Sequence, residues 1–320
     1  MSETVLRVQG LTVHYHTRRG PVRAVNDVSF DLREGETLGV VGETGCGKST
    51  VGKAILGLLP PRTLVRGALT LRGKDLLKLP EAEYRRLRGE ELALIFQDPM
   101  TRLDPLMTIR EHFEETIRAH DPGASKDEAA ARAVKVLRSM GIPESRLDHY
   151  PHEFSGGMRQ RIMIAMALVL NPKLLVADEP TTALDVIVEA QILEILKDLR
   201  RAYAMTLLLI THNLGIVAEV SDRTAVMYAG KLAELGPVAD VFRRPIHPYT
   251  QGLLASTIHL RTERLRSIDG VPPSLLDPPS GCRFHPRCPF AKDVCQEEEP
   301  PMVEYRPGQF AACHFGGDFV

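Results

Sequence analysis

Short hydrophobic stretches separated by glycine-containing turns open the chain. Runs rich in apolar and β-branched residues predict strands over 5–9, 11–15, 28–32 and 37–41. A helical spacing of apolar residues follows over 48–59, so the pattern changes from strand through loop to helix. Two later runs, 173–177 and 206–210, are apolar throughout, which is typical of strands buried on both faces of a parallel sheet. Since helical segments separate them, they predict an α/β core.

A region with little strand character lies between these parts of the chain. It extends over about 108–147 and contains a capping box, Ser125 with Glu128, that predicts the start of a helix. A further helix is predicted over 157–170, and together these features indicate an inserted α-helical subdomain. Beyond about Pro245, frequent prolines break every long element and indicate a separate C-terminal appendage.

Charge and composition exclude several classes of protein. The 320 residues include 40 Lys or Arg and 41 Asp or Glu, and a formal net charge of -1 argues against a nucleic-acid partner. The longest apolar run, 162–170, is much shorter than the roughly 20 residues that a membrane-spanning helix needs. Residues 1–11 include Glu3 and lack the apolar core of a secretory signal, so we expect a cytosolic protein.

A glycine-rich loop between a predicted strand and a predicted helix is the first candidate for chemistry. Its glycines would let successive backbone N–H groups and the helix N-terminus face an anion. The Lys48 amine would contact the terminal phosphates of a nucleotide, and the Ser49 hydroxyl would bind Mg²⁺. A chance glycine-rich turn is the alternative, but the strand and helix on either side favour nucleotide binding. The loop matches G-x-x-x-x-G-K-[ST] and, with the residue after it, comprises Gly42, Glu43, Thr44, Gly45, Cys46, Gly47, Lys48, Ser49 and Thr50.

Polar residues with possible roles in hydrolysis follow the strand-like runs 173–177 and 206–210 and a further predicted strand over 92–96. Because side chains alternate along a strand, Asp178 and Glu179 cannot share one role. Asp178 suits the metal, and Glu179 is placed to accept a proton from an attacking water, unless both belong to an acidic turn that caps a helix. His212 could bond a γ-phosphate, and Gln97 could reach the metal or the water. The alternative for His212 is a loop histidine whose hydrogen bonds are all made within the protein, and the alternative for Gln97 is a polar residue that only ends a strand.

A second helix start with anion-binding character lies at Ser155, Gly156 and Gly157. Its serine and glycines would present N–H groups and a helix dipole to an anion. One nucleotide has one set of phosphates, so this site would serve a nucleotide held by another subunit. An ordinary N-cap is the alternative.

These residues resemble the ordered motifs of the ATP-binding cassette (ABC) family: a phosphate loop, a Gln loop, a signature sequence, an Asp-Glu strand, an A-L-D loop and a switch histidine. All six occur here in that order over about residues 4–243. The resemblance implies an α/β fold with a RecA-like core, a β-subdomain and the helical insertion. It places a nucleotide-binding domain over 1–257, with its helical subdomain at about 98–160.

The same resemblance implies a head-to-tail dimer that encloses two ATP molecules. In that dimer Ser155, Gly156 and Gly157 would complete the partner's site. Asp185, in the A-L-D loop, would communicate across the dimer, and Tyr15 would stack on adenine, with a plain strand tyrosine as the alternative.

A narrower resemblance extends over nearly the whole chain. The segments 150–161 and 247–254 are similar to the ATP-binding subunit of dipeptide and oligopeptide importers, and Met158 resembles the D-type subunit rather than its F-type partner. This implies a heterodimer at the cytoplasmic face of the inner membrane, docked under two permeases and supplied by an extracytoplasmic peptide-binding protein. Importers of nickel or glutathione-like solutes, and a soluble non-transport ABC ATPase, are the alternatives. The chain departs from the family at Cys46, where Ser is usual, and at Asn213, where Asp is common.

Four of the five cysteines lie in the C-terminal extension, 258–320. Four thiolates are what tetrahedral Zn²⁺ and a [4Fe–4S] cluster each require. The gaps between these cysteines are wider than is typical for zinc, and a matching Cys-rich segment occurs in some dipeptide-importer ATPases, so we expect an iron–sulfur cluster. Zinc, and unligated or disulfide-bonded thiols, are the alternatives. The four candidates are Cys282, Cys288, Cys295 and Cys313.

Overall fold

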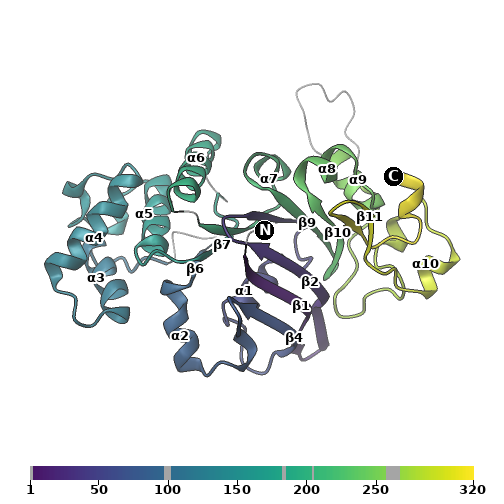
Figure 1. The fold of residues 1–320 in the computed structure, drawn as a ribbon, viewed down its shortest axis with the longest axis horizontal. Helices are drawn as coiled ribbons and strands as arrows, with labels where there is room; N and C mark the ends of the chain where they lie inside the picture. Colours follow the sequence, from purple (N-terminus) through teal and green to yellow (C-terminus); the bar gives the residue numbers. More distant parts are fainter. Residues whose placement is uncertain (1–2, 97–101, 182–184, 204, 257–266) are drawn as a thin grey trace. The chain divides into compact units, whose positions relative to one another are not determined.

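The computed structural model describes residues 3–96, 102–181, 185–203, 205–256 and 267–320 (Figure 1). The chain divides into two compact units. Unit 1 comprises Met1–Lys78 with Leu208–Val320, and unit 2 comprises Leu79–Leu207. Each unit contains both helices and strands, which confirms the predicted α/β class.

An antiparallel sheet forms the N-terminal part of unit 1 (Figure 1). The predicted strands 5–9 and 11–15 are one strand, because β1 continues through Gly10 with a φ of 58° and a shift of register against β2. Along β2, buried Val28, Phe30 and Leu32 alternate with more exposed residues, so one face of this sheet packs into the core. In spatial order the strands are β2 (Gly20–Arg33), β1 (Thr4–Thr17), β4 (Leu64–Leu71) and β5 (Lys74–Asp75).

A second, mixed sheet carries the glycine-rich loop of unit 1. Its strand β3 (Thr37–Val41) is buried along its whole length and is parallel to β9. Gly39 is required in β3 because a Cβ there would lie 2.6 Å from Val217 of helix α7 (Leu214–Val220). In spatial order the unit 1 strands are β11 (Val303–Arg306), β12 (Gln309–Ala311), β10 (Lys231–Pro237), β9 (Arg223–Tyr228), β3 and β8 (Thr206–Ile210), whose last three residues belong to this unit.

The C-terminal segment extends this sheet. β12 pairs antiparallel with β10, with Glu234 opposite Ala311 and Leu235 opposite Phe310. A distinct cysteine-rich module, expected from the frequent prolines, is therefore not supported. The prolines do shorten the elements, but edge pairing joins β11 and β12 to the body of unit 1.

Short helices complete unit 1. Asn213 caps α7, since its side chain accepts hydrogen bonds from the N–H groups of Gly215 and Ile216. The helices are α1 (Lys48–Ile55), α7 (Leu214–Val220), α8 (Val238–Arg243), α9 (Pro248–Ala255) and α10 (Asp293–Glu297), with 3₁₀ turns η1 (Leu76–Lys78), η4 (His285–Arg287) and η5 (Gly316–Phe319).

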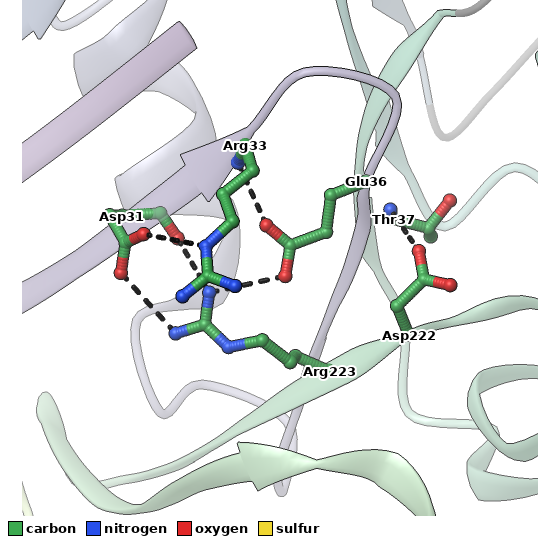
Figure 2. A network of polar contacts seen from close by, with 6 residues as sticks. All are labelled: Asp31, Arg33, Glu36, Thr37, Asp222 and Arg223. Carbon is green, nitrogen blue, oxygen red and sulfur yellow. Dashed lines mark hydrogen bonds and ion pairs between the residues drawn. The ribbon is translucent and has the colours of Figure 1, made fainter. Parts of the chain in front are cut away.

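A polar network fixes the start of β3 (Figure 2). The buried Glu36 carboxylate accepts hydrogen bonds from the Arg33 N–H at 2.8 Å and from the Arg223 guanidinium at 3.1 Å. Asp222 accepts a bond from the Thr37 N–H at 2.8 Å. The network ties the turn between β2 and β3 to β9, and thereby orients the strand that leads into the glycine-rich loop.

Unit 2 is mainly helical. The predicted capping box of Ser125 and Glu128 is confirmed at the start of α4, and the helix predicted over 157–170 corresponds to α5. Strands β6 (Leu92–Ile95) and β7 (Leu174–Asp178) pair in parallel. The helices are α2 (Glu81–Glu90), α3 (Ile109–His120), α4 (Lys126–Ser139), α5 (Gly156–Leu168) and α6 (Val186–Tyr203), with 3₁₀ turns η2 (Glu144–Arg146) and η3 (Pro151–Glu153).

Within the described ranges, no helix combines the length and the apolar character that crossing a membrane requires.

Candidate functional site

The glycine-rich loop of unit 1 follows β3 and leads into α1. Gly42, Gly45 and Gly47 have φ values of 151°, 81° and 106°, which side-chain-bearing residues rarely adopt. A Cβ on Gly42 would lie 2.1 Å from the Met227 carbonyl oxygen, whereas a Cβ on Gly45 would meet no atom within 4 Å. Gly42 is thus required by packing as well as by conformation, and Gly45 leaves the loop open where an anion would approach.

The Lys48 side chain is buried inside the loop. Its amine donates hydrogen bonds to the carbonyl oxygens of Gly42, at 2.8 Å, and Glu43, at 3.2 Å. Because the N-cap residue Gly47 has no side chain, it leaves the first N–H groups of α1 without a side-chain cap. A positive charge and uncapped N–H groups at one helix start form a site for phosphate.

Cys46, the departure from the usual Ser, is part of the packing of the loop. Burial raises the pKa of its thiol, so this side chain is neutral at physiological pH. Its carbonyl oxygen accepts a hydrogen bond from the Gly230 N–H at 2.8 Å. The residue therefore anchors the loop to the turn between β9 and β10.

Tyr15 lies beside the first turn of α1. Its hydroxyl donates a hydrogen bond to the Thr50 hydroxyl at 3.1 Å, and its side chain is half-buried. This contact orients the tyrosine next to the loop, and stacking on adenine stays a prediction. His212, also in unit 1, is exposed and directly precedes Asn213 and α7. Asn213 caps this helix as an Asp would, so the departure at this position keeps the capping hydrogen bonds.

In unit 2, the two predicted carboxylates lie at the end of β7. Asp178 is the last residue of the strand, and both carboxylates are half-buried. Glu179 has a φ of 50°, so the backbone turns sharply immediately after the strand. The side chain of Gln160, buried in α5, donates a hydrogen bond to the Pro180 carbonyl oxygen at 2.6 Å. This contact fixes the turn after Glu179, and the sequence analysis assigned it no role.

The second predicted anion site is the N-terminus of α5. Ser155 caps the helix, accepting a hydrogen bond from the Met158 N–H at 3.4 Å, and it is exposed together with Gly156. A Cβ on Gly157 would lie 2.5 Å from the Val188 side chain, so this glycine lets α5 pack against α6. Asp185 caps α6 by accepting a bond from the Val188 N–H at 2.9 Å. Gln97, Ala183 and Leu184 lie outside the described residues.

The expected metal site in the C-terminal segment is a wrong prediction. Among the described residues, no three or more His, Cys, Asp or Glu side chains are grouped so that they could hold a metal ion. The four cysteines line one cavity of about 20 Å³, room for about one water molecule, together with aromatic rings that include Phe284 and Phe290. Burial raises the pKa of Cys282 to about 11 and also raises those of Cys288 and Cys313, so these side chains are uncharged thiols at neutral pH. An iron–sulfur cluster is contradicted, and zinc has no support.

Comparison with known families matches two segments of the chain. The family described as "ABC transporter" matches residues 25–182, which include the glycine-rich loop, the α5 start and the two carboxylates. The family described as "Oligopeptide/dipeptide transporter, C-terminal region" matches residues 233–295.

Individual relatives align over almost the whole chain. "Oligopeptide transport ATP-binding protein OppD" of Salmonella typhimurium is 48% identical over 98% of this chain and 94% of that protein. "Dipeptide transport ATP-binding protein DppD" of Bacillus subtilis is 50% identical over 93% of this chain and 90% of that protein. The chain belongs to the ATP-binding subunits of oligopeptide and dipeptide ABC transporters. The resemblance stated above is thereby confirmed, and ATP hydrolysis is the activity of this family.

Solved structures agree with the fold. The dimeric post-hydrolysis state of the ATP-binding cassette MJ0796 bound to ADP and Pi has a TM-score of 0.65 at 27% identity, over 73% of this chain and 98% of that chain. A structure titled "Structure of ATP binding subunit of ABC transporter" has a TM-score of 0.60 at 33% identity, over 75% of this chain and 92% of that chain. The ABC nucleotide-binding fold is confirmed, and ATP with Mg²⁺ is what such a site takes.

The sequence analysis did not single out Tyr249, which contacts the phosphate loop from far along the chain. The Tyr249 hydroxyl accepts a hydrogen bond from the Glu43 N–H at 2.9 Å, and its ring is fully buried. The segment 247–254 was noted only for its family resemblance. A hydroxyl-bearing residue in that segment was the available signal, but its partner is 206 residues away and no local pattern connects them.

Proposed function

We propose that this chain hydrolyses ATP to drive the uptake of dipeptides or oligopeptides, as one of two unlike ATPase subunits. The D-type chain would pair head to tail with an F-type subunit at the cytoplasmic face of the membrane. Two permeases would carry the solute, and an extracytoplasmic binding protein would deliver it. The single observation that supports this best is that one chain combines an ordered phosphate loop with the C-terminal region of peptide transporters.

The nucleotide's phosphates would be held by the loop from Gly42 to Thr50. Lys48 would neutralise charge on the terminal phosphates, where its amine already lies inside the loop. Ser49 and Asp178, with Gln97, offer the hydroxyl, carboxylate and amide oxygens that Mg²⁺ prefers. When bound, Mg²⁺ would neutralise phosphate charge and orient the nucleotide.

Glu179 would accept a proton from the attacking water, and His212 would hydrogen-bond the γ-phosphate. The sharp turn at Glu179, braced by Gln160, supports a fixed orientation for this carboxylate. Tyr15 would stack on the adenine ring from its position beside α1.

The second ATPase subunit would use the α5 start of this chain. Ser155, Gly156 and Gly157 would contact the nucleotide that the partner holds, and Asp185 would transmit its state across the dimer. The exposure of Ser155 and Gly156 supports this, because another subunit could reach that end of the helix. We place the nucleotide-binding domain at 1–257, its helical subdomain at about 98–160 and the importer-type extension at 258–320.

Replacing Glu179 by Gln tests the hydrolytic role. Glu179→Gln removes the proton acceptor with little change of shape, so we expect ATP binding to be retained and turnover to fall by about 10²-fold or more. Glu194→Gln is the matched control, because Glu194 lies on the exposed side of α6, paired with Lys197. Binding of a fluorescent ATP analogue and release of phosphate are measured on both variants. Turnover at the wild-type rate in Glu179→Gln would remove this residue from the mechanism.

A further inference from the structure

Arg287, in the C-terminal segment, forms an ion pair with Glu43 in the phosphate loop. Its two terminal nitrogens donate to the two carboxylate oxygens at 2.8 and 3.1 Å, so the pair is bidentate. The Arg287 side chain is 5% exposed and that of Glu43 is 25% exposed. A geometry with two parallel bonds and little solvent is far more specific than an ordinary surface ion pair.

The Arg287 guanidinium also donates hydrogen bonds to groups other than Glu43. Its Nε donates to the Asp269 carbonyl oxygen at 2.9 Å, Nη2 donates to the Ile268 carbonyl oxygen at 3.3 Å, and Nη1 donates to the Tyr228 hydroxyl at 3.2 Å. It also lies over the Tyr228 ring, at 5.8 Å from the centroid. The hydrogen bonds to Glu43 raise the pKa of Arg287 further above its usual range. The arginine is therefore a rigid, permanently charged anchor for the loop.

Glu43 is fixed at its backbone as well as at its side chain. Its N–H donates to the Tyr249 hydroxyl, and its carbonyl oxygen accepts from the Lys48 amine. Glu43 therefore contacts both Arg287, through its carboxylate, and Lys48, the lysine that would contact the phosphates. Both Arg287 and Tyr249 lie in the stretch matched by the peptide-transporter C-terminal family, while Glu43 lies in the stretch matched by the ABC family.

We infer that Arg287 is a positioning residue for ATP. By donating two hydrogen bonds to the Glu43 carboxylate, it holds the glycine-rich loop and Lys48 in the conformation that binds the triphosphate. A loop with three glycines at positive φ has many alternative conformations when it is released. Holding it in the binding conformation before ATP arrives lowers the entropy cost of binding. The C-terminal segment of this transporter subunit thereby sets the affinity for nucleotide.

A purely structural role for Arg287, in which it only fastens the tail, makes different predictions. In that case replacing Glu43 would leave the nucleotide affinity unchanged, because the hydrogen bonds of Arg287 to Asp269, Ile268 and Tyr228 would still fasten the tail. If the Arg287–Glu43 ion pair positions the loop, Glu43→Ala and Arg287→Ala should lower the nucleotide affinity by similar factors. A double variant should then be no worse than the stronger single variant.

The test measures KM and kcat for ATP in the assembled transporter, and binding of a fluorescent ATP analogue to the full chain alone. We expect Arg287→Ala and Glu43→Ala each to raise KM and the dissociation constant roughly tenfold, with kcat changed less than about twofold. Arg287→Lys keeps the charge but loses the paired geometry, so it should recover part of the affinity. Arg306→Ala is the control, because Arg306 is a tail arginine that bonds the Arg244 carbonyl oxygen instead.

Each outcome decides between the two roles. If Arg287→Ala does not fold, which circular dichroism and thermal melting would reveal, Glu43→Ala carries the test because it leaves the other bonds of the arginine intact. Wild-type affinity in a folded Glu43→Ala variant would overturn the inference. The inference would also be overturned if the affinity losses of the two single variants multiply in the double variant, or if Arg306→Ala loses as much affinity as Arg287→Ala.

Discussion

The two adjacent glycines that open α5 differ in the space around them. A Cβ on Gly156 would meet nothing within 4 Å, whereas a Cβ on Gly157 would lie 2.5 Å from Val188 Cγ1. The first position therefore has room for a side chain. At the second, the β-branched valine must shift or α5 must move away from α6.

Alanine at these positions should separate the two effects. We expect Gly157→Ala to destabilise the folded chain by roughly 1–3 kcal/mol because of overpacking. Gly156→Ala should be neutral or stabilise it by up to about 1 kcal/mol, because alanine is the better helix former. Urea unfolding of both full-length variants, followed by circular dichroism, is the measurement. Equal midpoints for the two variants would contradict the packing at Val188.

At the scale of elements, α9 depends on a histidine that is buried and neutral. His247 Nδ1 accepts a hydrogen bond from the Tyr249 N–H at 3.0 Å, which caps the helix. Burial lowers the pKa of His247 from 6.5 to about 4. The helix start, which also positions Tyr249 toward the phosphate loop, therefore requires the unprotonated imidazole.

This histidine predicts a specific loss of stability in acid. Between about pH 6.5 and 4, the unfolded chain binds a proton at His247 and the folded chain does not. The free energy of unfolding therefore falls as the pH falls through this window, by about 3 kcal/mol in full. His247→Asn keeps an acceptor for the cap but does not titrate in this range.

The difference between wild type and His247→Asn isolates this contribution. Burial raises the pKa of the nearby Glu234, which makes stability increase as the pH falls, but Glu234 is present in both proteins. Urea unfolding at pH 7, 6, 5 and 4 should show a stronger loss in wild type than in the variant. Parallel pH profiles would contradict a neutral, buried His247.

Much of the nucleotide-binding part could be predicted because its signals are local. The runs 37–41 and 206–210 match β3 and β8, since a short, continuous apolar run between turns defines a buried strand. The phosphate loop is fixed by glycine and lysine spacing. The left-handed turn at Glu179 had no such signal, because a non-glycine residue adopts it only under tertiary constraint.

The C-terminal segment shows the limit of local patterns. Its prolines predicted an appendage and its cysteines a metal site, yet β12 pairs with β10 and the thiols line a small cavity with aromatic rings. Both outcomes depend on partners distant in sequence, as does the contact of Arg287 with Glu43, 244 residues away. Spacing along the chain carries no information about such pairs.

At the scale of the whole molecule, the proposal is that each ATP is bound by two different chains. Ser155 is exposed at the start of α5, so a bulky cation there would block a partner's nucleotide while leaving this chain's own loop intact. We expect Ser155→Arg to bind ATP normally as a single chain and to lose about 10²-fold or more of the turnover at the blocked site in the assembled transporter. Ser125→Arg, which removes the cap of another exposed helix start with no proposed nucleotide contact, is the control. Full turnover in the assembled Ser155→Arg complex would argue against a shared site.

The most direct test of the account is ATP-driven solute uptake by the assembled transporter. The chain is reconstituted into vesicles with the permeases and second ATPase with which it co-purifies, and labelled dipeptides, labelled oligopeptides and nickel are offered in turn. We predict peptide accumulation that requires hydrolysable ATP and is lost with Glu179→Gln. Uptake of nickel but not peptide, or peptide uptake that continues without ATP hydrolysis, would contradict it.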